Sequence, residues 1–340
     1  MREVYITGIG GEVGSTALDI NDVIKNLGVE EERRAKKLKK HCGTNKIYRF
    51  SEDSSLEQAS INAAKSALSN GRTDTKEVNG IYATTATPSA RWFMPGLAKI
   101  VGDGLNLSGI NMTSLSMGCV GGLDALLQAY NQAKLDSLEA KETSYLVIAG
   151  DQISRVIDMN DRATAPLFSD ASLAILVTNK QTVNGYKIKQ IGSTSLSGNT
   201  FSMRVRNPSA EGTDKPNTFV MEGNDVYEFA VKYALPIIPR LVGFDTIPER
   251  CYFIPHQGSG AILEQIALQT GLPPNRIYSE GISRIGNTPS NSAFFGLKDA
   301  LARSLVANNQ EVLIGVFGAE LKVGSVYLEP VGNTKTIIGN

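Results

Sequence analysis

One cysteine lies where a strand-like pattern gives way to a helical one. The residues before Gly118 resemble a short buried strand, and after Cys119 leucines recur at helical spacing. Cys119 would therefore lie at a helix N-terminus, where unpaired backbone N–H groups and the helix dipole favour a nucleophilic thiolate. Small neighbours such as Gly121 and Gly122 would leave room for a substrate carbonyl. A buried structural cysteine fits this position equally well, since free cysteine is among the most buried residue types.

Two further polar residues complete a chemically coherent set with Cys119. His256 is one of two histidines and follows the apolar run 252–255, and Asn287 is expected at the end of the equivalent strand further on. A lone histidine after an apolar run is more often a core residue, but ligands of α/β sheets bind where strands end. A thiolate could attack a thioester, and histidine and asparagine could then stabilise charge on a carbonyl oxygen. No serine, aspartate or metal cluster in the sequence offers a better set.

Strand and helix patterns alternate along the chain, which is typical of a layered α/β fold. We expect strands at 4–7, 78–85, 145–150, 171–177, 252–255, 312–317 and 324–328, and helices at 56–68, 97–105, 227–241, 261–268 and 294–301. The second half repeats the order of the first, weakly residue by residue but consistently. This predicts two fused copies of one α/β unit, residues 1–180 with Cys119 and residues 181–340 with His256 and Asn287.

Two segments near the N-terminus could be ligand-binding sites, but we favour a structural interpretation of each. The run 8–14 resembles a turn for a dinucleotide, but the third glycine of that fingerprint falls on Val13 and no acidic residue follows at the required distance. The helical segment after residue 30 carries six lysines and arginines between positions 33 and 40. A solvated helix face is the favoured interpretation. The alternative is a binding surface for an acidic carrier protein or for coenzyme A phosphates.

Composition limits the class of protein. The 340 residues include 34 basic and 34 acidic side chains, so no net charge attracts nucleic acid or an anionic membrane. Three cysteines form no even disulfide framework and suit no zinc site. The first residues lack a signal-peptide pattern, and no run reaches the roughly 18 apolar residues of a membrane span. We therefore expect a soluble cytoplasmic enzyme with reduced thiols.

Three motifs carry a resemblance to a known family. Ser116-Met-Gly-Cys119-Val-Gly, Pro255-His-Gln257 and Gly286-Asn-Thr288 resemble the active-site motifs of the thiolase superfamily, in its β-ketoacyl-(acyl carrier protein) synthase III branch. Flanking segments at 151–155, 161–164, 167–170 and 221–231 agree, so the resemblance covers nearly the whole chain. It implies a five-layered α-β-α-β-α thiolase fold built from two similar halves, a homodimer, and acyl-thioester substrates with no other cofactor.

The resemblance also implies roles for particular residues. Cys119 would accept an acyl group from coenzyme A or from acyl carrier protein, and His256 and Asn287 would hydrogen-bond the thioester carbonyl of a malonyl-type extender. Backbone N–H groups of Cys119 and Ala319 would form the oxyanion hole. Two more residues match substrate-binding positions. Arg155 matches one that contacts coenzyme A, and Met94 stands near one that enters the acyl pocket of the other subunit.

Departures from the family pattern point to a specialised enzyme. The segment 41–49 lacks the tryptophan and arginine motif that clamps the adenine of coenzyme A, and Ala261 replaces an arginine that docks the carrier protein. Glu320 and Lys322 add charges to a stretch that is normally apolar, where they are expected to face solvent.

The function we expect is a Claisen condensation of the acyl group on Cys119 with a malonyl-type or β-keto thioester, in a specialised fatty acid, polyketide or cofactor pathway. One alternative is a non-decarboxylating acyltransferase that uses His256 as general base. The other is an inactive scaffold subunit, which would have no need of an intact Cys, His and Asn set.

Overall fold

A computed structural model describes residues 1–51, 54–87, 94–198, 202–206 and 218–339. Its centre is a nine-stranded mixed sheet in the order β11-β12-β13-β8-β1-β7-β6-β4-β5. The strands are β1 (Tyr5–Val13), β4 (Val78–Thr85), β5 (Asn111–Ser116), β6 (Ser144–Asp151), β7 (Ala171–Thr178), β8 (Gly185–Ser195), β11 (Cys251–Pro255), β12 (Glu311–Gly318) and β13 (Lys322–Val331). Smaller two-stranded sheets pair β2 (Thr16–Asp19) with β3 (Lys46–Arg49) and β9 (Met203–Arg206) with β10 (Thr218–Met221).

The large sheet consists of two parts that meet at β1 and β8. In the described chain two residue pairs join these strands, Tyr5 with Lys187 and Ile6 with Tyr186. The first part contains β1 and β4–β7, and the second contains β8 and β11–β13. The predicted division after residue 180 falls in the connection between β7 and β8. Descent of the two halves from one duplicated unit stays a prediction.

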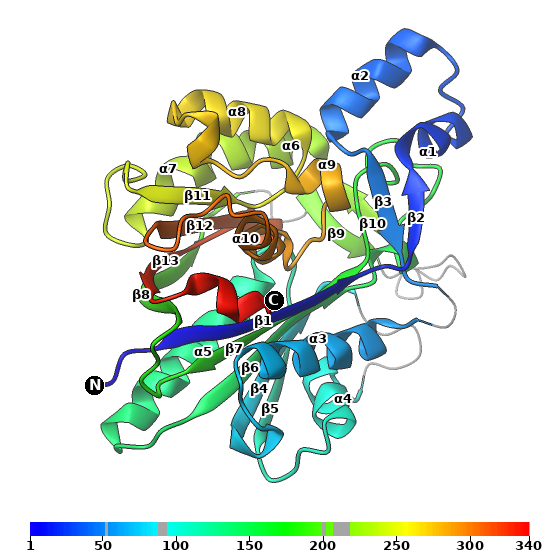
Figure 1. Cartoon of the computed structure of the whole chain (residues 1–340). Coiled ribbons are helices and arrows are strands. Elements are labelled where there is room, and N and C mark those ends of the chain that lie inside the picture. The colour runs from blue at the N-terminus through cyan, green and yellow to red at the C-terminus, as the bar shows by residue number, and fades with distance from the viewer. Residues whose placement is uncertain (52–53, 88–93, 199–201, 207–217, 340) are drawn as a thin grey trace.

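Helices cover both faces of each part of the sheet, which gives five layers. Helices α3 (Leu56–Asn70) and α4 (Leu97–Gly104) cover the outer face of the first part, and α5 (Gly121–Leu138) and α10 (Ser292–Ala302) lie between the parts. The outer face of the second part is covered by α8 (Gly260–Thr270) and by α6 (Gly223–Glu228), which continues through a π-helical segment (Phe229–Ala234) into α7 (Leu235–Arg240). In Figure 1, α3 and α4 lie on one side of the molecule, α7 and α8 lie on the other, and α10 lies between them.

The remaining helices are α1 (Ile20–Asn26), α2 (Glu32–Cys42) and α9 (Gly281–Ile285). The strands and helices predicted from 78 onward are present with slightly shifted ends, except that the helix expected at 227–241 contains the π-helical segment. In the part of the chain that the structure describes, no helix combines the length and apolarity needed to cross a bilayer.

Strand β11 shows why the predicted strands are continuously apolar. Tyr252 and Ile254 face the core between the two parts of the sheet, and Cys251 and Phe253 face the core under α7 and α8. Successive side chains of a strand point to opposite faces, so a strand covered on both sides must be apolar at every position.

The turn expected at 8–14 is wrong, because β1 continues through Gly8 to Val13 as one strand. A Cβ atom on Gly8 would lie 2.1 Å from the carbonyl oxygen of Ala67, and one on Gly10 would lie 2.1 Å from that of Ala63. These glycines therefore allow α3 to lie directly on β1, and they form no phosphate-binding turn.

Strand β5 is present where predicted but is not buried. It is the last strand of the sheet and, among the described strands, pairs with β4 alone. Asn111, Ser114 and Ser116 are exposed, and the residues between them are half-buried. The pattern resembled a buried strand because Met112 and Leu115 are apolar, but the missing neighbour leaves this edge open to solvent or to another chain.

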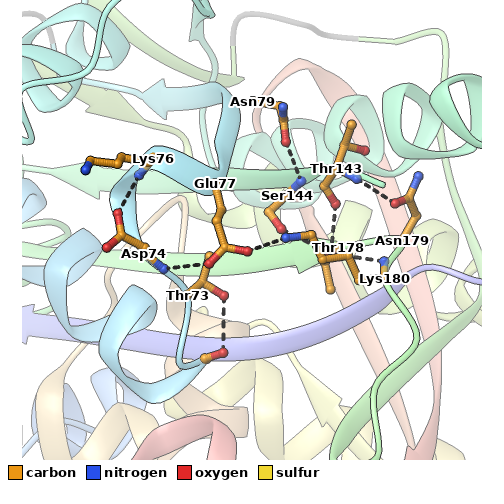
Figure 2. A network of polar contacts seen from close by, with 11 residues as sticks. Thr73, Asp74, Lys76, Glu77, Asn79, Thr143, Ser144, Thr178, Asn179 and Lys180 are labelled. Atoms are coloured by element: carbon orange, nitrogen blue, oxygen red, sulfur yellow. Dashed lines mark hydrogen bonds and ion pairs between the residues drawn. The ribbon is translucent and has the colours of Figure 1, made fainter. Parts of the chain in front are cut away.

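A polar network ties together the ends of β4, β6 and β7 that lie opposite Cys119 (Figure 2). The Asn79 side chain accepts a hydrogen bond from the Ser144 backbone at 2.9 Å, and the Asn179 side chain accepts one from Thr143 at 2.7 Å. Lys180 forms an ion pair with Glu77, just before β4. These contacts hold the parallel strands β4 and β6 and the antiparallel strand β7 together at the end of the sheet opposite the site described next.

Candidate active site

Cys119, His256 and Asn287 line one pocket, whose described lining comes from both halves of the chain. Cys119 lies between β5 and α5, and His256 follows β11 directly. Asn287 does not close a strand as expected. It lies between α9 and α10 and makes a single parallel bridge with Phe168. The structure thus brings together three residues that are up to 168 positions apart in the sequence (287 − 119).

Cys119 is nearly enclosed, with 3% of its surface exposed. Gly318, the last residue of β12, lies directly against it. A Cβ atom on Gly318 would lie 2.5 Å from Cys119 Cβ and 2.8 Å from Sγ. Only glycine at position 318 therefore leaves space for the thiol in its present position.

The glycines after Cys119 do not open space for a substrate, contrary to the sequence-based expectation. A Cβ atom on Gly121 would lie 2.4 Å from Thr84 Oγ1, and one on Gly122 would lie 2.3 Å from the carbonyl oxygen of Ser290. The Gly122 N–H donates to that same carbonyl at 3.2 Å. These glycines therefore seat the start of α5 against β4 and against the loop that carries Asn287.

His256 is 3% exposed, and burial lowers its pKa from 6.5 to about 4. Its ring packs edge-on against the Phe317 ring, with centroids 5.4 Å apart, and its Nδ1 lies 2.6 Å from Ser292 Oγ. At neutral pH the imidazole is therefore uncharged. It can donate one hydrogen bond through whichever ring nitrogen holds the proton.

The Asn287 side chain is fixed next to His256. Its Nδ2 donates to the Gly258 carbonyl at 3.0 Å, and its Oδ1 is buried without a hydrogen-bond donor among the described residues. The second hydrogen of Nδ2 has no acceptor among the described residues and can serve a ligand.

The loop that carries Asn287 is anchored to the first part of the sheet by Asp151. This fully buried carboxylate accepts from the backbone N–H of Ser290 at 2.9 Å and from its hydroxyl at 2.6 Å. Its other oxygen accepts from the Ala86 backbone at 2.7 Å. Burial raises the pKa of Asp151, and these hydrogen bonds oppose that shift. The sequence motif included Asp151, but nothing in the sequence showed that it holds the loop.

Three other predicted site residues lie at different distances from this pocket. The Ala319 backbone directly follows Gly318, the residue that packs against Cys119. Arg155 ends a short 3-10 turn after β6, and Met94 is 82% exposed. Neither Arg155 nor Met94 is among the described residues that line the pocket, and their roles stay predictions.

The described lining of the pocket holds no lysine, arginine, aspartate or glutamate. Apolar side chains such as Phe168, Met203, Met221 and Ile262 dominate it. Cys42 also lines the pocket, but burial raises its thiol pKa to about 12, so it stays protonated. The surroundings of Cys119 therefore favour uncharged substrate groups over a carboxylate.

Lys322 does not face solvent as expected. Its Nζ lies 2.6 Å from Asp124 Oδ2, and the two side chains are 18% and 7% exposed. The other oxygen of Asp124 accepts from Ser193 Oγ at 2.8 Å. Asp124 lies in the first turn of α5, so this pair attaches the helix that follows Cys119 to β13. Glu320 is exposed, in agreement with the expectation.

We expect Asp124→Ala to lower the free energy of unfolding by about 3 kcal/mol, because it leaves Lys322 largely buried without its counter-charge. The midpoint of chemical denaturation measures this effect. Asp124→Leu combined with Lys322→Met should recover most of the loss. The control is Lys36→Ala, which breaks an exposed pair with Glu32 and should cost no more than about 0.5 kcal/mol. Equal effects of the two alanine variants would contradict the structural role of the buried pair.

Comparison with known proteins gives one consistent result. The family model "3-Oxoacyl-[acyl-carrier-protein (ACP)] synthase III" matches residues 114–196, and the model of its C-terminal part matches residues 249–329. A β-ketoacyl-[acyl-carrier-protein] synthase III of Clostridium novyi is 25% identical over 332 residues, which cover 96% of this chain and 98% of that protein.

Solved structures share the fold over almost the whole chain. A 3-oxoacyl-(acyl carrier protein) synthase III from Pseudomonas aeruginosa aligns with a TM-score of 0.83 at 22% identity, over 98% of this chain and 99% of the other. The priming β-ketosynthase of the R1128 polyketide biosynthetic pathway aligns with a TM-score of 0.85 at 21% identity, over 97% of each chain.

The five-layered fold is the fold of these solved structures. The two family models and the Clostridium novyi relative place the chain in the thiolase superfamily. Within the superfamily the chain is a β-ketoacyl-(acyl carrier protein) synthase III-like condensing enzyme, and so an acyltransferase.

Proposed function

We propose that Cys119 carries an acyl group and that the enzyme condenses it with a malonyl-type or β-keto thioester. The observation that supports this best is the shared, uncharged pocket of Cys119, His256 and Asn287. The Cys119 thiolate attacks the carbonyl carbon of an acyl thioester and expels the carrier thiolate, which leaves acyl-Cys119. Backbone N–H groups of Cys119 and Ala319 are our candidates for stabilising the oxyanion in this step.

The second half-reaction uses the other two side chains. The carboxylate of a malonyl thioester leaves as carbon dioxide, and its bonding electrons form an enolate whose oxygen accepts hydrogen bonds from His256 and Asn287. The enolate carbon then attacks the acyl carbonyl, and the Cys119 thiolate departs. An apolar pocket assists the loss of carbon dioxide. It destabilises the localised charge of the carboxylate more than the delocalised charge of the enolate.

The low pKa of His256, about 4, favours condensation over the alternative acyltransferase. Transfer to an alcohol or amine would need His256 to remove a proton as general base, and a base of so low a pKa does this poorly at neutral pH. A neutral imidazole donates a hydrogen bond to an enolate without giving up its proton.

Our experiment for this function is intact-protein mass spectrometry with a panel of acyl-coenzyme A and acyl-carrier thioesters, followed by a chase with malonyl thioester. The proposal requires one acyl group on the protein, lost during the chase as carbon dioxide is released. An acyl group that persists through the chase and leaves only for an alcohol or amine would support the acyltransferase. If none of the thioesters labels the protein, the result would contradict the proposal and favour the inactive scaffold subunit.

Exposed basic side chains on helix α2 support the proposal that the acyl group arrives on an anionic carrier. Arg33 and Lys37 are exposed, lie one turn apart on the same face, and have no ion pair with any described residue. One further turn along this face is His41, which lines the mouth of the pocket. We propose that this stripe, Arg33-Lys37-His41, attracts the phosphates or acidic surface of coenzyme A or acyl carrier protein.

We expect Arg33→Glu combined with Lys37→Glu to raise KM for acyl-coenzyme A or acyl-carrier thioesters on the order of tenfold at low salt and less at high salt. The KM for a short neutral thioester without phosphates should stay unchanged. Lys65→Glu combined with Lys76→Glu makes the same change of charge at exposed positions on and near α3 and should leave both KM values as they are. An equal rise for charged and neutral thioesters would contradict the role of the stripe.

We also propose a homodimer in the cytoplasm. The open edge of β5 offers a surface for a second copy. A Cβ atom on Gly96 would lie 2.5 Å from Ser114 Oγ of β5, so the exposed Met94 stands close to that edge and would lie in such an interface. All three cysteines are outside disulfides, which fits a reducing compartment.

A further inference from the structure

His256 makes one side-chain hydrogen bond in the described structure, and its partner belongs to none of the three family motifs. The Nδ1 atom lies 2.6 Å from Ser292 Oγ. Ser292 is the first residue of α10, five positions after Asn287, and only 2% of its surface is exposed. The two groups are therefore shielded from water, and each must satisfy the other.

The direction of this hydrogen bond follows from a second contact of Ser292. Its Oγ accepts a hydrogen bond from the Gln257 backbone N–H at 3.0 Å. A hydroxyl carries one hydrogen, which needs an acceptor of its own, and Nδ1 of His256 is the acceptor that the structure describes. If Nδ1 instead held a proton, two N–H groups would point at Oγ and the buried hydroxyl hydrogen would lack a described acceptor.

The proton of the neutral ring therefore lies on Nε2. This is the nitrogen that the serine leaves available, and a Cβ atom on Gly258, another pocket residue, would lie 3.8 Å from it. We propose that Ser292 is a positioning residue that holds His256 as the tautomer protonated on Nε2, so that an N–H donor faces the pocket. This inference rests on the proposed condensation, because that reaction needs a donor at this place throughout enolate formation.

The direct test is nitrogen-15 NMR of the enzyme labelled only at histidine. The chain has two histidines, and the exposed His41 serves as the internal reference. In the wild-type protein we expect His256 to be protonated on Nε2 and unprotonated on Nδ1. Ser292→Ala should give a mixture of tautomers. A proton on Nδ1 in the wild type, or an unchanged tautomer in Ser292→Ala, would overturn the assignment whether or not the proposed reaction is correct.

Kinetics supply a second readout that a purely structural role would not give. Ser292→Ala should slow the malonyl chase about tenfold to a hundredfold, the range typical for loss of the hydrogen-bond partner of a metal-bound histidine. The rate of Cys119 acylation should stay within a factor of about two, which also shows that the variant folds. Ser292→Thr keeps the hydroxyl and should restore much of the chase rate.

Ser290→Ala is the matched control for the NMR experiment. Ser290 lies on the same loop and its hydroxyl donates to Asp151, so this variant removes a buried hydroxyl without touching His256. We expect the His256 tautomer to remain on Nε2 in this variant. Equal loss of acylation and chase rates in Ser292→Ala would contradict a specific role of Ser292 toward His256.

Discussion

Cys119→Ala should abolish acyl transfer to the protein and lower turnover by a factor on the order of 10⁴ to 10⁶, the range for loss of a catalytic nucleophile. The reason is that no other described thiol of the pocket can replace it. Cys42 also lines the pocket, but burial raises its pKa to about 12, so almost none of it is thiolate at neutral pH. Mass spectrometry of the intact protein after incubation with the acyl thioester measures the result.

The matched control is Cys42→Ala, which removes a buried thiol from the same pocket and should still take up one acyl group. Peptide mapping of the labelled protein should place that group on Cys119. Both variants should show cooperative unfolding, since each replaces a cysteine by another small residue. Retained turnover in Cys119→Ala would refute the nucleophile, and labelling at Cys42 would move the covalent step to another residue.

His256→Ala should slow the second half-reaction much more than the first. Loss of one donor to a developing oxyanion costs about 10²-fold to 10³-fold in rate, so the malonyl chase should slow by this factor. Acylation of Cys119 should change much less, because its oxyanion is assigned to backbone N–H groups. Single-turnover measurements of acylation and of carbon dioxide release separate the two steps.

The pH dependence of the chase gives an independent check on His256. Burial lowers its pKa to about 4, and the neutral form is the proposed donor. As the pH falls, the ring therefore stays mostly neutral and competent well below its ordinary pKa of 6.5, and it becomes half protonated only near pH 4. The pH profile of the chase rate should therefore contain no titration of His256 centred at pH 6.5. A titration attributable to His256 is one that is present in the wild type and absent in His256→Ala. Such a titration, or equal slowing of both half-reactions, would contradict the assignment.

Local patterns in the sequence were enough to predict most of the strands and helices. The strand before His256 is a clear case, because β11 is buried on both faces and its residues must be apolar at every position. The same local rules failed where the outcome depends on whether a segment distant in the sequence packs against the residues in question. Gly8 and Gly10 resembled a turn, but they are glycines because α3 lies within van der Waals distance of β1. Strand β5 resembled a buried strand, but it is an edge.

The sequence by itself determined the layered α/β class, the place of Cys119 between a strand and a helix, and the candidate set of Cys119, His256 and Asn287. These follow from hydrophobic period and from residue type, which act locally or through motifs. Contacts between distant segments were decided only by the tertiary structure. Gly318 packs on Cys119, Asp124 pairs with Lys322, and Ser292 faces His256. Each of these depends on the distance and direction of two side chains in the folded chain, and no spacing along the sequence encodes that geometry.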